Sequence, residues 1–162
     1  MGVVPVTLQR AKAAPCRGQP PMTQARIHPR IVDVMHRDRS ILETFGARVD
    51  RAWGGECMMQ ATVPAALVNA ADFAHGAVAF ALLDTACAYA LGSIDLGGVT
   101  LNANTSYVRG AQAGSTLTAQ VSVVSTTRRI ATLRGEVHLL EAHAPVLAAH
   151  GTFVFQLLQR RD

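Results

Sequence analysis

The amino-acid sequence predicts an α+β fold in which one antiparallel sheet wraps around a single apolar helix. The run from Phe73 to Gly92 is apolar on nearly every face, which is typical of a helix that is surrounded by protein. In the segments that follow this run, apolar and polar residues alternate with a period of two, which indicates half-buried strands. A central helix and a sheet packed on it account for both patterns.

Length and composition fit a single domain that associates with copies of itself. The chain has 162 residues, of which 49% are hydrophobic, so it can bury one core but is short for two. Charged residues make up only 16%, below the roughly 25% of an average soluble domain. This shortage of charge indicates that part of the surface is buried against another copy of the chain.

The chain is expected to begin with a leader, residues 1–21, and to continue as one domain over residues 22–162. The leader is basic, has no acidic residue and shows little amphipathic pattern. It also carries Pro5, Pro15, Pro20 and Pro21. We therefore expect a poorly ordered extension rather than a targeting segment.

The first elements of the domain are expected to be a helix and a hairpin. From Ile31 to Phe45 apolar residues recur near helical spacing, and Gly46 provides a stop. Between Ala47 and Val63, the central Gly54-Gly55 pair is a hairpin turn signal, and apolar and polar residues alternate after it. One amphipathic helix and two strands fit these residues.

The strands after the central helix are expected to be antiparallel neighbours in sequence order. Alternation is found over Val99–Tyr107, Leu117–Val123, Ala131–Leu139 and Leu147–Leu157. The connections between these segments are short, which favours pairing of consecutive strands.

Charge, cysteine and histidine patterns disfavour several classes of protein. The formal charge is +4, but five of the 15 basic residues precede the first acidic residue, Asp33. From Asp33 onward, the other ten basic residues are balanced by 11 acidic ones, so no nucleic-acid partner is expected. The three cysteines are odd in number and lack a CxxC pair, which argues against disulfides and zinc and favours a cytoplasmic location. The six histidines lack metal-ligand spacing, so neither a metal nor another cofactor is expected. A membrane partner is not expected either, because Asp84 lies near the centre of the apolar run.

Two residues of the central helix are candidates for chemistry. Gly76 lies where the helix should begin, so its backbone N–H is an unpaired donor at the positive end of the helix dipole and can polarise a carbonyl group. Asp84 lies two turns further along, among apolar residues, where a carboxylate is desolvated unless it meets a cleft or a partner. It is a candidate base or nucleophile, and the alternative is a structural hydrogen bond.

The residues around these two allow both structural and functional interpretations. His75 could be an ordinary residue of the helix N-cap, and Asn69 a simple turn former. Thr85 is interpreted as a packing residue beside the site.

The spacing of these residues resembles a known family. His75-Gly76 begins six positions after Asn69, and Asp84-Thr85-Ala86 begins nine positions after His75. The similarity extends to Gly98–Thr100, Tyr107–Arg109 and Ala113–Val121. Over roughly Ile31 to Phe155, the chain resembles the phenylacetate-pathway (PaaI-type) branch of hotdog-fold acyl-CoA thioesterases, and the sheet around a central helix is what a hotdog fold requires.

The resemblance implies hydrolysis of an acyl-CoA substrate to free acid and CoA. It implies that Asp84 is the general base or nucleophile and that the Gly76 amide binds the thioester oxygen. Asn69 and His75 would line the substrate, with Asn69 helping to hold the lytic water, and Thr100 would lie near that water.

Substrate-binding residues are less well defined. Thr85 lies beside the site. The candidate wall residues are aromatic or methionine side chains, each of which is more often part of a core or an interface: Phe73, Met58, Met59, Trp53 and Tyr107. Arg109, Arg128 and Arg129 are the cations available to the CoA phosphates, with solvation as the alternative. The sequence departs from the family at Ala77, where relatives have a second glycine, and at Gly110-Ala111, where they often have Pro-Gly.

The site is expected to span two chains. Gly76 and Asp84 are about 12 Å apart along the axis at roughly 1.5 Å per residue, so one thioester cannot touch both in the same chain. Two copies related by a two-fold axis, with antiparallel helices, would bring Gly76 of one copy to Asp84 of the other. The resemblance implies a homodimer or homotetramer with the site at the subunit interface.

Two other functions remain open on the residues alone. A CoA-dependent dehydratase or hydratase would need an acid/base pair, for which His75 is the only eligible partner of Asp84. A non-catalytic acyl-CoA binding module would use the pocket without needing the Asp84 carboxylate.

Overall fold

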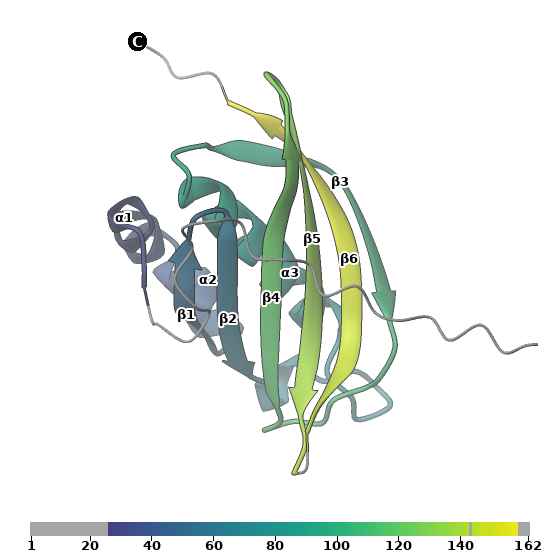
Figure 1. Cartoon of the computed structure of the whole chain (residues 1–162). Coiled ribbons are helices and arrows are strands. Elements are labelled where there is room, and N and C mark those ends of the chain that lie inside the picture. Colours follow the sequence, from purple (N-terminus) through teal and green to yellow (C-terminus); the bar gives the residue numbers. More distant parts are fainter. Residues whose placement is uncertain (1–25, 143, 159–162) are drawn as a thin grey trace, which may run out of the picture.

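The computed structural model of the chain describes residues 26–142 and 144–158 (Figure 1). The predicted leader, residues 1–21, lies outside the described residues. The helices are α1 (Pro29–Arg37), α2 (Arg39–Thr44) and α3 (Gly76–Gly92), with a 3-10 turn at Ala65–Leu67. The strands are β1 (Ala47–Trp53), β2 (Glu56–Thr62), β3 (Gly98–Tyr107), β4 (Thr116–Thr126), β5 (Ile130–Leu140) and β6 (Pro145–Leu157).

The single helix predicted over Ile31 to Phe45 is wrong, because the structure has two short helices there. The break is at Asp38, whose backbone (φ −88°, ψ 9°) is not helical. Its N–H closes α1 on the Val34 carbonyl, and its own carbonyl accepts the Ile41 N–H that opens α2. The Asp38 carboxylate accepts a hydrogen bond of 3.0 Å from the Tyr89 hydroxyl on α3. This bond to α3 holds the residue at which the chain turns.

The predicted hairpin of β1 and β2 is confirmed. Gly54 and Gly55 have φ values of 63° and 85°, the left-handed conformation that a tight hairpin turn requires and that glycine adopts without strain. The pairing is antiparallel from Trp53 opposite Glu56 to Ala47 opposite Ala61.

The six strands form one antiparallel sheet in the order β1-β2-β4-β5-β6-β3. Consecutive strands are neighbours from β4 to β6, as predicted, but the expected neighbourhood of β3 and β4 is wrong, because β3 pairs with β6. The link of residues 108–115 can span roughly 26 Å when extended. Three strand spacings of about 4.8 Å amount to only about 14 Å, so a short link can still cross two strands.

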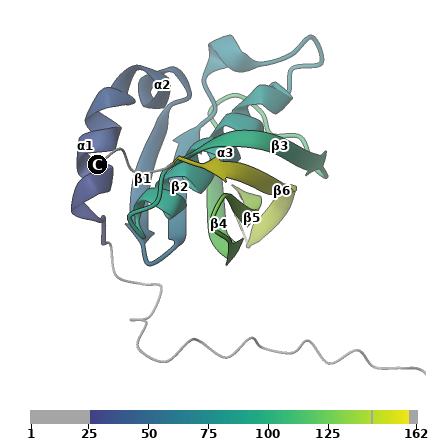
Figure 2. The ribbon, with the colours of Figure 1, turned by 90° about the horizontal axis from the view of Figure 1, so that it is seen from above.

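The sheet curls around α3, which occupies the centre of the fold (Figure 2). Leu82, Leu83 and Ala86 of α3 are fully buried against inward-facing strand residues. Gly135 on β5 lies so close to the helix that a Cβ there would be 2.6 Å from Leu83 Cδ2, so this position needs glycine. The apolar central helix and the strands around it are confirmed, and α3 begins at Gly76, where the start of the helix was expected.

Strand β3 lies at the edge of the sheet. One side of it pairs with β6, and its other side has no partner strand among the described residues. Its apolar residues Val99 and Leu101 are about half exposed, at 51% and 53%. The alternation predicted for this strand therefore does not bury an apolar face within one chain.

No helix in residues 26–142 and 144–158 combines the length and the apolar character that crossing a membrane requires.

The Tyr89–Asp38 hydrogen bond should contribute measurably to stability. Tyr89 is 1% exposed, and a hydrogen bond to a charged group contributes about 1.5–3 kcal/mol. We expect Tyr89→Phe to lower the free energy of unfolding by that amount in urea titrations at fixed protein concentration. Arg39→Met is the control, because the Arg39–Glu43 pair is exposed and its loss should leave the midpoint unchanged. A Tyr89→Phe protein as stable as wild type would show that this bond does not hold the α1–α2 break.

Candidate active site

The start of α3 presents a free backbone donor at Gly76. The His75 Nδ1 atom accepts the Ala77 N–H at 3.1 Å, and the His75 carbonyl accepts the Val78 N–H at 2.8 Å. The Gly76 N–H makes no hydrogen bond within the described residues. Because it lies in the first turn, it is at the positive end of the helix dipole. His75 is therefore the helix N-cap, and its neutral ring carries the proton on Nε2.

The loop before α3 is organised by Asn69. Its Oδ1 atom accepts the Ala71 N–H at 2.9 Å and the Phe73 N–H at 3.2 Å, while its own N–H donates to the Phe73 carbonyl at 2.7 Å. These bonds hold a tight turn in which Asp72 has a φ of 61°. Asn69 thus forms a turn, as its structural interpretation predicted. Its amide NH₂ group has no hydrogen-bond partner in the described part of the chain.

A cavity of about 400 Å³ opens beside this free donor. Asn69, Phe73, His75 and Gly76 line one side of it, and residues 107–111 line the other. The structure thus brings together predicted site residues from the loop, the helix start and the end of β3.

Tyr107 lies directly over the start of α3. A Cβ built on Gly76 would be 3.3 Å from Tyr107 Cε1 and 3.5 Å from the phenolic oxygen. The sequence predicted Tyr107 only as a candidate wall residue. Its position over Gly76 depends on the pairing of β3 with β6, which the sequence did not predict. The Tyr107–Arg109 motif was the available signal.

Arg109 and Gly110 form the outer wall of the cavity. Arg109 Nη1 donates to Glu141 Oε1 at 2.7 Å, and both side chains are about half exposed. Gly110 packs on the ring of Phe73, and a Cβ there would be 2.7 Å from Phe73 Cδ1. Glycine at position 110 therefore allows Phe73 to line the cavity.

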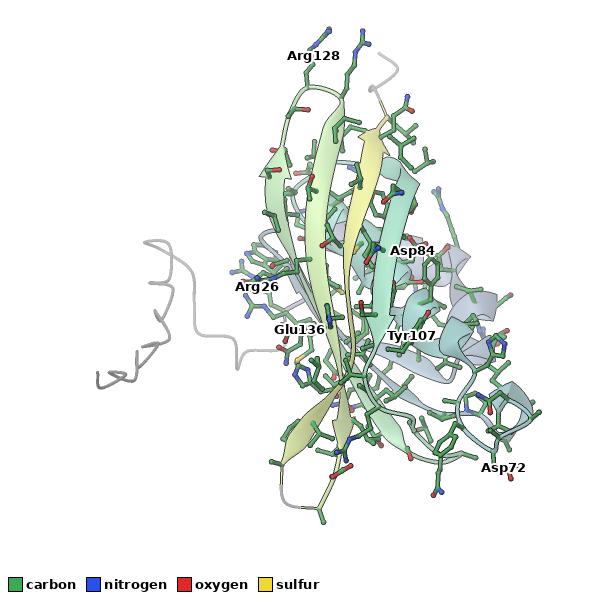
Figure 3. The ribbon with its side chains drawn as sticks, turned by 90° about the vertical axis from the view of Figure 1, so that its right-hand side faces the viewer. Arg26, Asp72, Asp84, Tyr107, Arg128 and Glu136 are labelled. Carbon is green, nitrogen blue, oxygen red and sulfur yellow. The ribbon has the colours of Figure 1, made fainter. Side chains whose placement is uncertain are left out.

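Asp84 lies outside this cavity, on the part of α3 that faces the start of β3 (Figure 3). Its half-buried carboxylate accepts a 2.7 Å hydrogen bond from the Thr100 hydroxyl. One turn away, burial raises the pKa of the Cys87 thiol, and the nearby Asp84 carboxylate raises it further. Cys87 therefore stays a protonated thiol. The second carboxylate oxygen of Asp84 makes no hydrogen bond within the described residues, so Asp84 is the candidate nucleophile or base of this region.

The remaining predicted residues are distributed around the molecule. Thr85 lines a narrow crevice beneath α2, with Ile41 and Phe45. Arg128 lies at the tip of the β4–β5 hairpin, far from Tyr107 in the same chain, and Arg129 is next to it (Figure 3). One chain thus gathers Asn69, Phe73, His75, Gly76 and Arg109 at one place, and Asp84 with Thr100 at another.

Other cavities and clusters hold none of the predicted catalytic residues. A pocket of about 190 Å³ on the outer face of the sheet is lined by Arg51, Glu56 and Glu136, among others. Within residues 26–142 and 144–158, no group of three or more His, Cys, Asp or Glu side chains could hold a metal ion.

Comparison with known proteins places this geometry in a family. The family model described as thioesterase superfamily matches residues 71–145, which include Gly76 and Asp84 but not Asn69. A putative esterase of Archaeoglobus fulgidus is 28% identical over 108 residues, 67% of this chain and 70% of the relative.

Solved structures agree with this match. A variant of phenylacetic acid degradation protein PaaI from Thermus thermophilus is 30% identical, with a TM-score of 0.66, over 72% of this chain and 98% of that protein. A hypothetical thioesterase of Streptococcus pneumoniae, solved with coenzyme A, is 21% identical, with a TM-score of 0.72, over 81% of this chain and 99% of that one.

The sheet order and the enclosed helix define a hotdog-fold protein. The chain belongs to the thioesterase superfamily, in its PaaI-type family, and it is a thioester hydrolase.

Proposed function

We propose that the chain hydrolyses acyl-CoA thioesters to the free acid and CoA, using the Gly76 amide as oxyanion donor and Asp84 as general base or nucleophile. The observation that carries the proposal is the Gly76 N–H at the start of α3, which has no partner among the described residues and borders a cavity of about 400 Å³. The coenzyme A in the structure of the Streptococcus pneumoniae relative supports the choice of substrate.

The proposed chemistry uses charge that develops during attack on the thioester. As an oxygen nucleophile adds to the thioester carbon, the carbonyl oxygen becomes negative, and one preformed amide donor stabilises it by about 2.7–4 kcal/mol. Asp84 either takes the proton of the attacking water or attacks the thioester carbon directly to give an anhydride that water then cleaves. In both routes the carbon–sulfur bond breaks as the tetrahedral adduct collapses, and CoA leaves as a thiolate that is then protonated. Thr100 holds one carboxylate oxygen at 2.7 Å and leaves the other free for either route.

Asn69 and His75 are proposed to orient the substrate with their donor groups. Their acceptor atoms Oδ1 and Nδ1 are occupied by backbone N–H groups. The Asn69 amide NH₂ and the His75 Nε2–H thus remain available to a carbonyl oxygen or a water molecule. This matches the role expected of Asn69 in holding the lytic water.

The proposed site combines two chains. Asp84 lies outside the cavity of its own chain, and β3 offers an edge with no partner strand among the described residues. That strand carries Thr100 near one end, bonded to Asp84, and Tyr107 at the other end, over Gly76. Antiparallel pairing of β3 with a second copy about a two-fold axis would place each end beside the opposite end of its partner. We therefore propose a homodimer, or a homotetramer of two such dimers.

The arginines are proposed to bind the CoA phosphates. Arg109 lies at the cavity wall of the same chain. Arg128 and Arg129, at the distant hairpin, could approach that cavity only from a second copy. Phe73 is proposed as a wall of the cavity, and Thr85 as a residue beside the acyl group.

Replacing the Asp84 carboxylate tests its catalytic role. We expect Asp84→Asn, which is nearly isosteric, to fold and assemble as wild type but to lose at least about 10²-fold in kcat for acyl-CoA hydrolysis. CoA release is followed with a thiol reagent, and hydration of crotonyl-CoA is assayed in parallel to detect a hydratase. A folded variant with wild-type turnover would exclude Asp84 as the base or nucleophile.

The Gly76 amide is tested by a pair of substitutions. Proline is well accepted at the first helical position, and the extended His75 backbone (ψ 138°) suits the residue before a proline. We expect Gly76→Pro, which removes the N–H, to lower kcat by about 10²–10³-fold. Gly76→Ala keeps the N–H but places the same Cβ against Tyr107, so it measures the steric cost alone. Equal losses in the two variants would contradict the role of the amide.

Mixing two inactive variants tests the two-chain site. Gly76→Pro and Asp84→Asn chains, carrying different affinity tags, are refolded together at equal amounts. If Gly76 of one copy works with Asp84 of the other, each mixed dimer has one intact site, and about a quarter of wild-type activity returns because about half of the dimers are mixed. Mixed dimers isolated through both tags that remain inactive would show that the site does not combine chains in this way.

A further inference from the structure

We propose that the hydroxyl group of Tyr107 is a second hydrogen-bond donor to the thioester oxygen, alongside the Gly76 amide. This inference rests on the proposed acyl-CoA hydrolysis and adds a catalytic residue to it. Tyr107 ends β3 and lines the same cavity as Gly76.

The distance between the two donors is compatible with one shared acceptor. The phenolic oxygen is 3.5 Å from the position of a Cβ on Gly76. Standard bond lengths place that Cβ roughly 2.5 Å from the Gly76 nitrogen, so the two donor atoms are at most about 6 Å apart. Two donors that each lie about 3 Å from one oxygen can be separated by up to about 6 Å. An oxygen bound to the Gly76 N–H can therefore also accept from Tyr107.

The tyrosine also has the chemistry that this position needs. Its hydroxyl has no recorded hydrogen-bond partner in the described part of the chain, and its side chain is accessible, with 55% of the residue exposed. The end of the ring that carries the hydroxyl, rather than the body of the ring, lies nearest Gly76: the closest atoms are Cε1, Cζ and the oxygen. A donor held at the end of a strand can stabilise developing negative charge without first giving up a hydrogen bond to another described residue.

The two tyrosines of the chain differ in burial and in hydrogen bonding, so one can serve as a control for the other. Tyr89 is buried and its hydroxyl donates to Asp38, whereas Tyr107 is exposed and faces the cavity. Removal of the Tyr89 hydroxyl should therefore affect stability, and removal of the Tyr107 hydroxyl should affect catalysis. Tyr89→Phe is thus a matched control for Tyr107→Phe.

The first measurement compares the kinetics and stability of the two variants. We expect Tyr107→Phe to keep the wild-type unfolding midpoint, to raise KM slightly and to lose about 10²-fold in kcat, the loss typical of one oxyanion donor. Tyr89→Phe should lower the midpoint and keep kcat. A Tyr107→Phe enzyme with wild-type kcat overturns the inference, and so does a loss that appears in KM alone, since that indicates ground-state binding only.

The second measurement identifies the atom that Tyr107 contacts. An acyl-CoA analogue in which a methylene replaces the thioester sulfur keeps the carbonyl oxygen, whereas an S-alkyl-CoA thioether lacks it. We expect Tyr107→Phe to weaken binding of the ketone analogue in calorimetric titrations and to leave binding of the thioether unchanged. Equal effects on both ligands would show that Tyr107 acts on the cavity wall rather than on the oxygen.

Failure of this inference can be distinguished from failure of the proposed function. A wild-type enzyme that hydrolyses acyl-CoA and is inactivated by Asp84→Asn, but not by Tyr107→Phe, retains the proposed function and loses the second donor. A wild-type protein that releases no CoA from any acyl-CoA overturns both.

Discussion

The rigid length of α3 is the constraint on which the rest of the proposed site depends. Gly76 begins the helix and Asp84 lies two turns along it. The sheet encloses the helix, and Leu82, Leu83 and Ala86 are fully buried close to Asp84. A close-packed interior of this kind resists bending or shortening of the helix. The two groups therefore stay about 12 Å apart along the axis, and the arrangement proposed for catalysis would need a second copy of the chain to bring them together.

Strand β3 offers a place for that completion. An unpaired sheet edge is a liability, because its free N–H and C=O groups can pair with another chain. In this protein the edge strand also exposes Val99 and Leu101 and carries contacts to both halves of the site. Pairing with a second copy would cover the edge and join the two halves in one step, so the proposed assembly and the proposed chemistry have a common physical origin.

The segment before α3 shows how structural and binding roles can share one side chain. Asn69 and His75 each use an acceptor atom to hold local backbone, one in a turn and one at the helix N-cap. Their donor groups have no hydrogen-bond partner among the described residues, and they line the same cavity as the free Gly76 N–H. A region whose acceptors are occupied and whose donors are free favours a carbonyl oxygen or an anion. The structural and functional interpretations of these residues are thus compatible.

The sequence determined much of the fold because hydrophobic periodicity is local. The apolar central helix and the alternation of β4, β5 and β6 followed from it. The Gly54-Gly55 pair indicated the β1–β2 hairpin, and the family was indicated separately, by the resemblance in the spacing of Asn69, His75 and Asp84. The catalytic roles, the oligomeric state and the cytoplasmic location stay predictions. The pairing of β3 with β6, the break at Asp38 and the placement of Tyr107 over Gly76 were decided only by the tertiary structure. Each of these depends on contacts between residues far apart in the chain, such as Tyr89 with Asp38, and periodicity within one segment carries no information about which distant segment that segment will meet.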